Sequence, residues 1–570
     1  MLGRTRRAAA AAACVAGALL VAPAASASGD QGRQRTGNMI FIHPDGSDAA
    51  IWDAARVYWK GPDGSLEWDR LPAAVPYRGH AADDLTTSSN GGATTHAFGY
   101  KVDAPASFGT DSGAADVLGG DATVPRTIRA LSGYPGSWLR EAANRGHPIG
   151  VVNDGDVAEP GTAAFLTEVT ERTDASALLI AQQLVQGRPG FGAKDKDPVV
   201  ILGGGEELFF PEGTPFCTAA QLATPVRNGA IRSTTTACVV HRPAGDTLPE
   251  AQEQEDPPAT TGGARTDDVN LAAAAVRDGY TLIRTRAEFE RLQTGFKDGR
   301  VDPAKTKVLG LFADEDIFND ESEESLADRG LVDRSVPADA KQTQLVLYGS
   351  EPGTPGYRPP TAPEMARLAT TVLDAHSTEV RKPFATVWEV EGTDNFSNTN
   401  KAIGTLGEAK YADDMIGVAR TYLDREPRTT ILTAADGNAG GLQLDTFNVD
   451  DVDEETPGVQ PLPTTVGDGA PLNPTLDEDL TGSLDGRTGR NTAPFLAEPD
   501  QFGQRLAFAV TWVGTGDYNG GVVARSAGLR ADAVQGLSER FQNQDVYRIA
   551  YLTLFGERLR FPTGQVAPTR

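Results

Sequence analysis

The sequence is poor in positive charge. Its 52 lysine and arginine residues stand against 78 aspartate and glutamate residues, which gives a formal net charge of −26 at pH 7. A protein that binds a nucleic-acid backbone needs clustered lysine and arginine to displace counterions. We therefore exclude nucleic acid as a bound scaffold. An acidic surface of this kind suits an extracellular protein, or one that collects cations.

Long apolar runs are absent as well. The most apolar segment, 8–22, is too short and too rich in alanine to span a membrane. Arginines precede it and the small residues Ala25-Ser26-Ala27 follow it, which is the order of parts in a signal peptide. We predict that residues 1–27 are removed and that the protein is secreted. Thr5-Arg6-Arg7 is a weak twin-arginine match, so the export route stays open.

Cysteine is scarce. Of the 3 cysteines, Cys14 lies in the predicted signal peptide, which leaves Cys217 and Cys238 as a pair. In an oxidising compartment we expect this pair to form one disulfide. The sequence offers no second cysteine pair for a structural zinc site, and no histidine-paired cysteine motif that would indicate a catalytic thiol.

Short apolar runs alternate with amphipathic segments along the chain. Residues 363–376 and 411–425 carry apolar side chains at spacings of three and four, which predicts helices. Strands that alternate with helices indicate an α/β fold, with a central, mostly parallel sheet covered by helices on both faces. Acidic residues follow several of the runs, at the edge where open α/β sheets place their sites. The runs that predict strands are 38–42, 148–152, 198–202, 307–312, 385–388 and 429–433.

Two stretches do not fit this alternation. Residues 213–300 are polar and hold the cysteine pair, and residues 448–500 are rich in acidic residues, glycine, proline and threonine. We predict that both are insertions, and that the second lies on the surface because it has too few large apolar side chains to order itself alone. The prediction is then one domain over 38–550 and a C-terminal tail over 551–570.

The segment Thr87–Lys101 holds two serines, a run of small residues, and then a threonine, a glycine and a lysine. It resembles the nucleophile helix of the alkaline phosphatase family. In this alignment Ser89 takes the position of the nucleophile and Ser88 replaces the usual aspartate. Ser112, in Thr110-Asp111-Ser112, is a rival because its immediate motif is closer to that of the family. The residues after Ser112 lack the threonine, glycine and lysine pattern, so we favour Ser89.

Further blocks resemble the same family in the same order, over about residues 38–550. The resemblance implies the family's α/β fold and an action on small phosphate esters. The matching blocks are His43–Gly46, Glu159–Phe165 followed by Arg172, Leu202–Gly205, Val390–Gly392, Thr433–Asp436 followed by Gly440–Leu442, and Tyr547 in Asp545–Arg548. The site residues implied by the alignment are metal ligands at Asp45, Glu391 and Asp436, magnesium ligands at Glu159 and Thr162, and a phosphate-binding arginine at Arg172.

The residues in these blocks are suited to phosphate ester hydrolysis. A serine such as Ser89 is a poor nucleophile at neutral pH unless a base or a metal removes its proton. Divalent cations on Asp45, Glu391 and Asp436 would activate Ser89 and a water molecule. Arg172 would bind two phosphate oxygens with its planar guanidinium, and the start of the helix after Ser89 would add backbone donors.

Histidine is scarce where the family needs it. The family holds two zinc ions with three histidines in its second half, but this chain has 6 histidines in all and none after His376. Each missing imidazole lies at or beside an oxygen donor. Calcium and magnesium prefer oxygen ligands, whereas zinc favours nitrogen and sulfur. The substituting donors are Asp394 and Asn398, Asn438 beside Gly437, and Tyr518 with its neighbours Asp517 and Asn519.

We therefore predict an all-oxygen metal cluster that is rich in calcium. Magnesium is the alternative at Asp45 and Glu391, and zinc is disfavoured. His43 and His96 lie beside the predicted site, and we interpret both as packed or hydrogen-bonded residues rather than ligands.

The function predicted from the sequence is that of a secreted, metal-dependent phosphatase that hydrolyses phosphate monoesters through a phosphoserine at Ser89. A phosphodiesterase of the same fold is one alternative. A sulfate-ester hydrolase is another, but its compact cysteine or serine signature is absent. The non-enzyme alternative is an extracellular cation-binding protein that has lost catalysis. The sequence indicates neither the natural ester nor the oligomeric state.

Overall fold

The computed structural model describes residues 34–104, 106–111, 125–190, 195–218, 221, 238–240, 261–319, 321–333, 336–349, 357–446, 484–485, 494–560 and 567–568. The predicted signal peptide, 1–27, and the rival serine Ser112 lie outside these ranges. Within the part of the chain that the structure describes, none of the helices combines the length and the apolar character that crossing a membrane requires.

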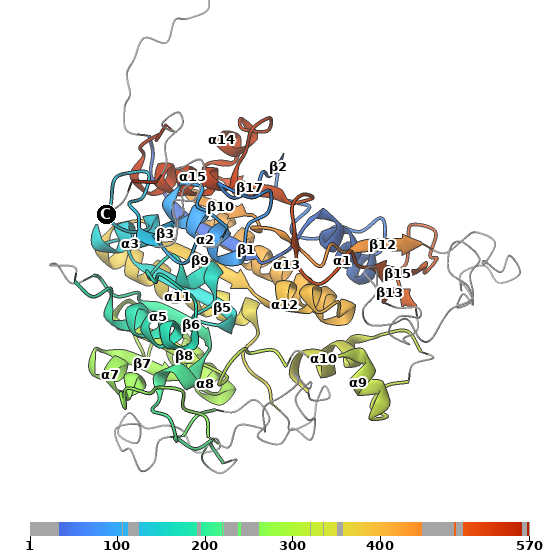
Figure 1. Ribbon diagram of the computed structural model, residues 1–570, viewed down its shortest axis with the longest axis horizontal. Coiled ribbons are helices and arrows are strands. Elements are labelled where there is room, and N and C mark those ends of the chain that lie inside the picture. The colour runs from blue at the N-terminus through green and yellow to red at the C-terminus, as the bar shows by residue number, and fades with distance from the viewer. Residues whose placement is uncertain are drawn as a thin grey trace, which may run out of the picture.

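A nine-stranded sheet forms the centre of the molecule, in the order β2-β17-β10-β1-β9-β5-β6-β8-β7 (Figure 1). Neighbouring strands are parallel except at one edge, where β17 runs antiparallel to both β10 and β2. All six strands predicted from the sequence are present in this sheet. Its strands are β1 Asn38–Pro44, β2 Ala73–Pro76, β5 Ile149–Asp156, β6 Val200–Gly204, β7 Tyr280–Ile283, β8 Lys307–Leu311, β9 Ala385–Val390, β10 Thr429–Thr433 and β17 Val523–Gly528.

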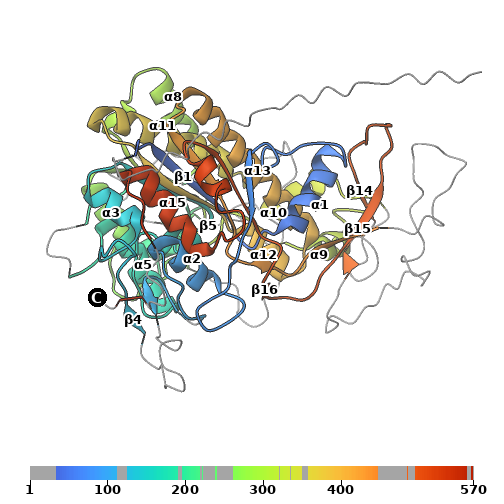
Figure 2. The same ribbon diagram turned by 90° about the horizontal axis from the view of Figure 1, so that it is seen from above.

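Helices cover both faces of the sheet, as predicted (Figure 2). One face packs against α11 (Ala362–Val380) and α13 (Ala402–Arg425), with α1 (Ala49–Lys60) beside α13. The other face packs against α3, α4 and α15, and α2 lies against these helices. The bounds on this second face are α2 Ser89–Phe98, α3 Trp138–Asn144, α4 Pro160–Ala163 and α15 Asn543–Phe555.

The alternation of side chains along the central strand β1 explains the two layers. Met39 and Phe41 belong to the core under α2, α3 and α15, whereas Ile40 and Ile42 belong to the core under α1, α11 and α13. Successive side chains of a strand point to opposite faces, so a continuous apolar run fills both layers. Such a run is typical of a strand that is buried on both sides.

The remaining elements surround this sheet. The other helices are α5 Asp174–Gln186, α7 Leu271–Arg277, α8 Arg286–Lys297, α9 Glu323–Asp328, α10 Ala340–Tyr348, α12 Gly392–Asn398 and α14 Ala531–Gln535, with 3-10 turns at Glu206–Phe209 and Pro303–Lys305. The short strands are β3 Thr110–Asp111, β4 Arg126–Thr127, β11 Asn438–Ala439, β12 Gln443–Thr446, β13 Leu484–Asp485, β14 Phe495–Leu496, β15 Ala507–Thr511 and β16 Asp517–Tyr518.

Two predicted boundaries need correction. The expected insertion at 213–300 ends earlier, because α7, β7 and α8 fold onto the main domain and β7 forms the last strand of the sheet. The expected tail does not begin at residue 551, because α15 continues to Phe555 and buries Tyr551, Leu552 and Leu554. Its apolar pattern stops only at Gly556, which takes the left-handed conformation that ends many helices.

The cysteine prediction is confirmed. Cys217 and Cys238 form a disulfide, and both lie buried beside Val240. Most of the predicted insertion at 448–500 lies outside the described residues. The parts that are described include β13 and β14, which pair with β15 at the side of the molecule away from β7 (Figure 1).

Candidate metal centre and nucleophile

Acidic side chains gather at the carboxyl end of the central strands. Asp45 directly follows β1, Glu391 directly follows β9, and Asp436 comes shortly after β10. These three strands are neighbours and parallel, so they end at the same edge of the sheet. Asp394, in the first turn of α12, faces the same place and interacts electrostatically with both Asp45 and Asp436. The structure thus brings together four carboxylates that the sequence separates by almost 400 residues.

Burial and mutual repulsion dominate the electrostatics of these four groups. Burial, followed by the charge of Asp436, raises the pKa of Asp45 well above its ordinary value. Burial and the neighbouring acids, among them Glu159 and Asp394, likewise raise the pKa of Glu391. The pKa of Asp436 is lowered, because its interactions with Asp45 and the nearby His43 outweigh the effect of burial. Without a cation, the folded protein therefore holds protons here that free carboxyl groups would release.

Several oxygens of this cluster have no hydrogen-bond partner. Among the described residues, Oδ2 of Asp45, Oε2 of Glu391 and Oδ2 of Asp436 are buried and unpartnered. A buried carboxylate without a partner is costly, and bound metal ions are one of the two usual ways to compensate it. The donor set therefore fits divalent cations.

A second group of donors adjoins these carboxylates at Asp394. Asn398 donates through Nδ2 to Oδ2 of Asp394 at 2.9 Å and to Oδ1 of Asp517 at 3.2 Å. Its own oxygen accepts the backbone N–H of Gly440 at 3.1 Å. Burial and the charge of Asp436 raise the pKa of Asp517 to about 6. Asn398 therefore holds two carboxylates in place, with its amide nitrogen rather than its oxygen turned toward them.

Ser89 is the first residue of α2, whose start faces this acidic cluster. Ser88 caps the helix, since its Oγ accepts the N–H of Gly91 at 3.3 Å. Gly92 packs so closely on the cluster that an added Cβ would lie 2.4 Å from Cβ of Asp436. Ser89 and Gly92 are three residues apart and share one face of the helix. The side of α2 that carries Ser89 is thus the side against Asp436.

Arg172 and Glu159 lie at the rim of the same site. Arg172 forms an ion pair with Glu159, and its side chain is 39% exposed. Glu159 in turn interacts with Glu391, and burial raises the pKa of Glu159. A small pocket beside Asp436 includes Thr86 and Thr87, the residues that lead into α2. A partly exposed guanidinium and a serine at the start of a helix are therefore placed around one acidic cluster.

Comparison with known proteins identifies the family. The family model described as alkaline phosphatase matches residues 36–229 and 245–462. The chain belongs to the alkaline phosphatase family. The predicted family membership is thereby confirmed, and the protein is a hydrolase of that family.

Individual relatives of this alkaline phosphatase agree with the match. The chain is 25% identical, over 434 residues, to streptomycin-6-phosphate phosphatase of Streptomyces griseus, which covers 73% of this chain and 77% of that protein. The structure is similar to that of alkaline phosphatase from the Antarctic bacterium TAB5, with a TM-score of 0.52 and 14% identity over 92% of this chain and 100% of that one. Thermus thermophilus alkaline phosphatase gives a TM-score of 0.54 and 17% identity over 93% of this chain and 92% of that one. At these identities, the structural likeness shows the shared fold.

Two of the predicted oxygen donors, Tyr518 and Asn438, also have contacts outside the four carboxylates. The hydroxyl of Tyr518 lies beside Gly514, where an added Cβ would be 2.3 Å from it. Its neighbour Asp517 is the residue that reaches Asp394 and Asn398. The amide nitrogen of Asn438 donates to Oδ2 of Asp48 at 3.1 Å, and its oxygen is buried without a hydrogen-bond partner among the described residues. The sequence indicates which turns carry oxygen donors, but it does not indicate which side chain of each turn faces the carboxylate cluster.

Thr162 is fully buried in α4, one layer beneath the carboxylates. Its Oγ1 accepts a hydrogen bond from Nδ2 of Asn153 at 3.1 Å. The same amide nitrogen donates to Oε2 of Glu389 at 2.6 Å. Thr162 is therefore connected to the site through Asn153 and Glu389, two residues that the sequence analysis did not single out.

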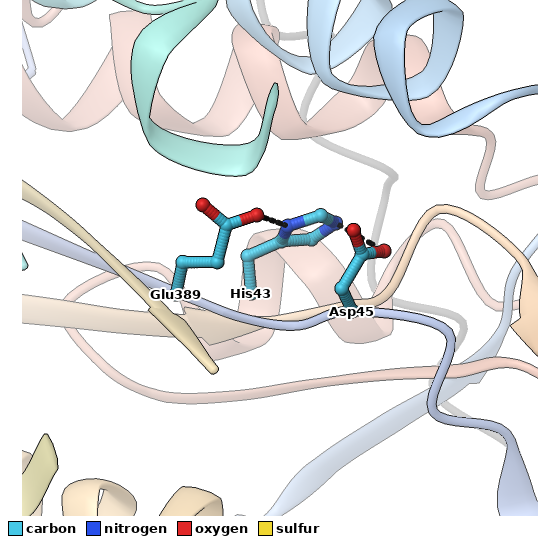
Figure 3. Close-up of side chains that lie close together, drawn as sticks. All are labelled: His43, Asp45 and Glu389. Atoms are coloured by element: carbon cyan, nitrogen blue, oxygen red, sulfur yellow. Dashed lines mark hydrogen bonds and ion pairs between the residues drawn. The ribbon is translucent and has the colours of Figure 1, made fainter. Parts of the chain in front are cut away.

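His43 is buried beside the carboxylates, and the sequence analysis interpreted it as a packed residue. His43 on β1, Asp45 directly after β1 and Glu389 on β9 form a compact group of side chains that could hold a metal ion (Figure 3). Nδ1 of His43 lies 3.4 Å from Oε1 of Glu389, and Nε2 lies 3.7 Å from Oδ1 of Asp45. The available signal was the two-residue spacing of His43 from Asp45 and of Glu389 from Glu391, which puts each pair on one face of a strand.

Proposed function

We propose that this protein is a metal-dependent phosphomonoesterase that acts on small phosphate esters and uses Ser89 as its nucleophile. The observation that carries the proposal is the cluster of the buried Asp45, Glu391 and Asp436 and the half-buried Asp394 against the face of α2 that carries Ser89. Cations held there would supply positive charge that lowers the pKa of the serine hydroxyl and stabilises the charge that develops on the phosphoryl oxygens.

The residues of the chain divide the remaining work. Oγ of Ser89 attacks phosphorus, the bond to the ester oxygen breaks, and the alcohol leaves while the serine is phosphorylated. Water then attacks the phosphoserine, releases inorganic phosphate and restores the hydroxyl of Ser89. Arg172 would exchange part of its ion pair with Glu159 for two oxygens of the phosphate, and the backbone N–H groups at the start of α2 would face the same group.

The donor set supports hard cations at the cluster. Carboxylate oxygens supplied by Asp45, Glu391, Asp394 and Asp517 dominate it, and calcium and magnesium bind oxygen ligands. We infer that calcium or magnesium occupies the positions built on Asp394 and Glu391. The protein would work outside the cytoplasm, an inference supported by the disulfide between Cys217 and Cys238.

The proposed substrate class is supported by the position of Arg172. Arg172 is partly exposed at the rim, so the phosphate of a small soluble ester can reach it from solvent. The Streptomyces griseus relative is named for a phosphorylated small molecule, which supports an ester of that kind rather than a macromolecular one.

A pair of serine substitutions tests the proposal. Ser89→Ala should lower kcat for nitrophenyl phosphate by at least about 10³-fold, because it removes the nucleophile. Ser88→Ala is the matched control at the same helix start. It should cost about 1 kcal/mol of stability through loss of the cap and change kcat by less than about threefold.

Three results would contradict the proposal. Undiminished phosphate release by Ser89→Ala would show that Ser89 is not the nucleophile. Faster turnover of the bis ester than of the monoester would make the protein a phosphodiesterase. If the native protein releases no phosphate with calcium, magnesium, manganese or zinc, it is a cation-binding protein without catalysis.

A further inference from the structure

A row of polar side chains crosses three neighbouring strands beneath the carboxylates. His43 on β1 is the register partner of Glu389 on β9, and Glu389 is the register partner of Asn153 on β5. Side chains at paired positions of adjacent strands lie side by side on one face of the sheet. All three are buried, with an exposed fraction of 1% or less. They lie on the face covered by α2 and α4, next to the buried polar residues Thr162 and His96.

The hydrogen bonds of this row fix the orientation of the imidazole. Asn153 donates to Oε2 of Glu389 at 2.6 Å, and Oε1 of Glu389 faces Nδ1 of His43 at 3.4 Å. Glu389 therefore accepts from both neighbours, which places the proton of a neutral His43 on Nδ1. The lone pair of Nε2 is then left free on the side of the acidic cluster.

α4 packs directly on the contact between His43 and Glu389. An added Cβ at Gly161 of α4 would lie 1.8 Å from Oε1 of Glu389 and 2.2 Å from Nδ1 of His43. Any larger residue at this position would collide with the contact between His43 and Glu389. The glycine thus permits α4 to close over the polar row, and the row in turn is held against α4.

Nε2 of His43 is aimed into the gap between two carboxylates. It lies 3.7 Å from Oδ1 of Asp45 and 3.9 Å from Oδ1 of Asp436, beyond hydrogen-bond distance, and it has no hydrogen-bond partner among the described residues. Two ligands of one ion with bonds of about 2.0–2.2 Å lie roughly 3–4 Å apart. Nε2 of His43 therefore lies at the separation expected of a ligand that shares one cation with either carboxylate oxygen.

We propose that Nε2 of His43 is a metal ligand, together with Asp45 and Asp436, and that Glu389 is the positioning residue that holds its ring. A carboxylate that accepts from the far nitrogen of a metal-bound histidine is a common arrangement at metal sites. The inference rests on the proposed function, since it names a ligand of the same metal centre. The ligands of that centre are then mixed: the metal position at His43 has a nitrogen ligand, and the position at Asp394 and Asp517 has oxygen ligands alone.

The mixed donor set changes the expected metal at this position. Imidazole suits transition metals such as manganese, iron and zinc, whereas calcium and magnesium bind oxygen. The position at His43 should therefore take a transition metal in preference to calcium, while the position at Asp394 and Asp517 keeps a hard cation.

Pulsed electron paramagnetic resonance of the manganese-loaded protein tests this ligand directly. The spectrum of the wild type should show modulation from a directly bound imidazole nitrogen. His43→Gln should lose the modulation, and it should bind the manganese ion that the wild type holds most tightly at least about tenfold more weakly. Glu389→Gln should keep the modulation but bind this ion about tenfold more weakly. His96→Gln is the control, because His96 lies next to His43 but its Nε2 bonds to the Tyr77 hydroxyl at 2.6 Å.

The outcomes separate this inference from the proposed function. Manganese binding without nitrogen modulation in the wild type would overturn the ligand, and so would modulation that persists in His43→Gln. Loss of modulation in His96→Gln alone would assign the nitrogen to His96 and overturn it too. The spectra need no substrate, so a wild type that shows the modulation but releases no phosphate would contradict only the proposed function. Should His43→Gln fail to fold, wild-type protein with isotopically labelled histidine still decides, because an unchanged spectrum overturns the proposal.

Discussion

The two sides of the metal centre are built differently. The nitrogen side consists of His43, Asp45 and Asp436, with Glu389 behind them. These residues lie on parallel strands or shortly after them, and all four are buried. The oxygen side, Asp394, Asn398 and Asp517, sits on a short helix and a two-residue strand, and Asn398 and Asp517 are partly exposed. Strands in the middle of a sheet fix side chains more tightly than exposed turns do.

The difference has a consequence for the chemistry at each side. The nitrogen side presents a fixed set of donors next to the helix face of Ser89, which suits activation of a nucleophile. The oxygen side can adjust, which suits the flexible coordination of calcium. We therefore expect substitutions on the nitrogen side to act mainly on catalysis, and those on the oxygen side to act more on binding of the ion.

The largest expected effect belongs to Asp436, which both sides share. Asp436→Asn removes a charge that interacts with Asp45, Asp394 and Asp517. It should lower kcat/KM for nitrophenyl phosphate by about 10³-fold or more, because the cations lose a central ligand. Steady-state kinetics with added metal is the measurement, and circular dichroism checks the fold. An activity within tenfold of the wild type would show that the cluster is not the metal centre.

Removal of the metal should lower the stability of the protein, because the carboxylates of the cluster then repel one another. At a free ion concentration of about 1,000 Kd, bound metal stabilises by about 4 kcal/mol, which corresponds to roughly 4 °C in Tm for a chain of this length. A chelator should therefore lower Tm by about that amount at pH 8. Calorimetry with and without chelator is the measurement. An unchanged Tm would contradict the assignment of the buried carboxylates to metal.

The effect of the chelator should depend on pH. The folded-state pKa of Asp517 is about 6, above its ordinary value of 3.8, and burial raises the pKa of Asp45, Glu391 and Asp394 in the same direction. A raised carboxyl pKa means that the folded state binds more protons than the unfolded state. The stability from these groups is thus present near pH 4 and is lost as pH rises through 6. The Tm of the metal-free protein should fall over this range, and less steeply in Asp517→Asn.

The smallest effects distinguish the two neighbours on the oxygen side. Asp517→Asn should weaken calcium binding by about tenfold, since it removes a carboxylate beside Asp394. Tyr518→Phe should change calcium affinity by less than about twofold, because its hydroxyl lies against Gly514. Calorimetric titration of the metal-free protein measures both. The reverse order would restore Tyr518 as the ligand that the sequence alignment suggested.

The central sheet could be predicted from the sequence because its strands are short apolar runs, which can be recognised without knowledge of the residues that pack against them. The prediction failed at one edge of the sheet, because β7 lies within a polar stretch that was interpreted as an insertion. The end of α15 was also missed, since Tyr551, Leu552 and Leu554 look like a tail until they are seen packed against the core.

The same contrast applies to the site. Residues that directly follow strands, such as Asp45 and Glu391, could be predicted because all parallel strands end at one edge. The orientation of the side chains within a turn could not be predicted, so the sequence offered Tyr518 together with Asp517, and the structure places Asp517 beside Asp394 and Asn398. His43 was passed over because a lone histidine in an apolar run is usually a packed residue. Its partner Glu389 becomes visible only once the register of β1 and β9 is known.

The most direct test of the account is to trap the phosphoryl group on the protein. The metal-loaded enzyme is mixed with nitrophenyl phosphate, quenched in acid, digested and analysed by mass spectrometry. We expect phosphate on the peptide that contains Ser89, absent after treatment with chelator and absent in Asp436→Asn. Phosphate on another residue, or on Ser89 without any metal, would contradict the claim that the carboxylates at the sheet edge hold cations against this serine.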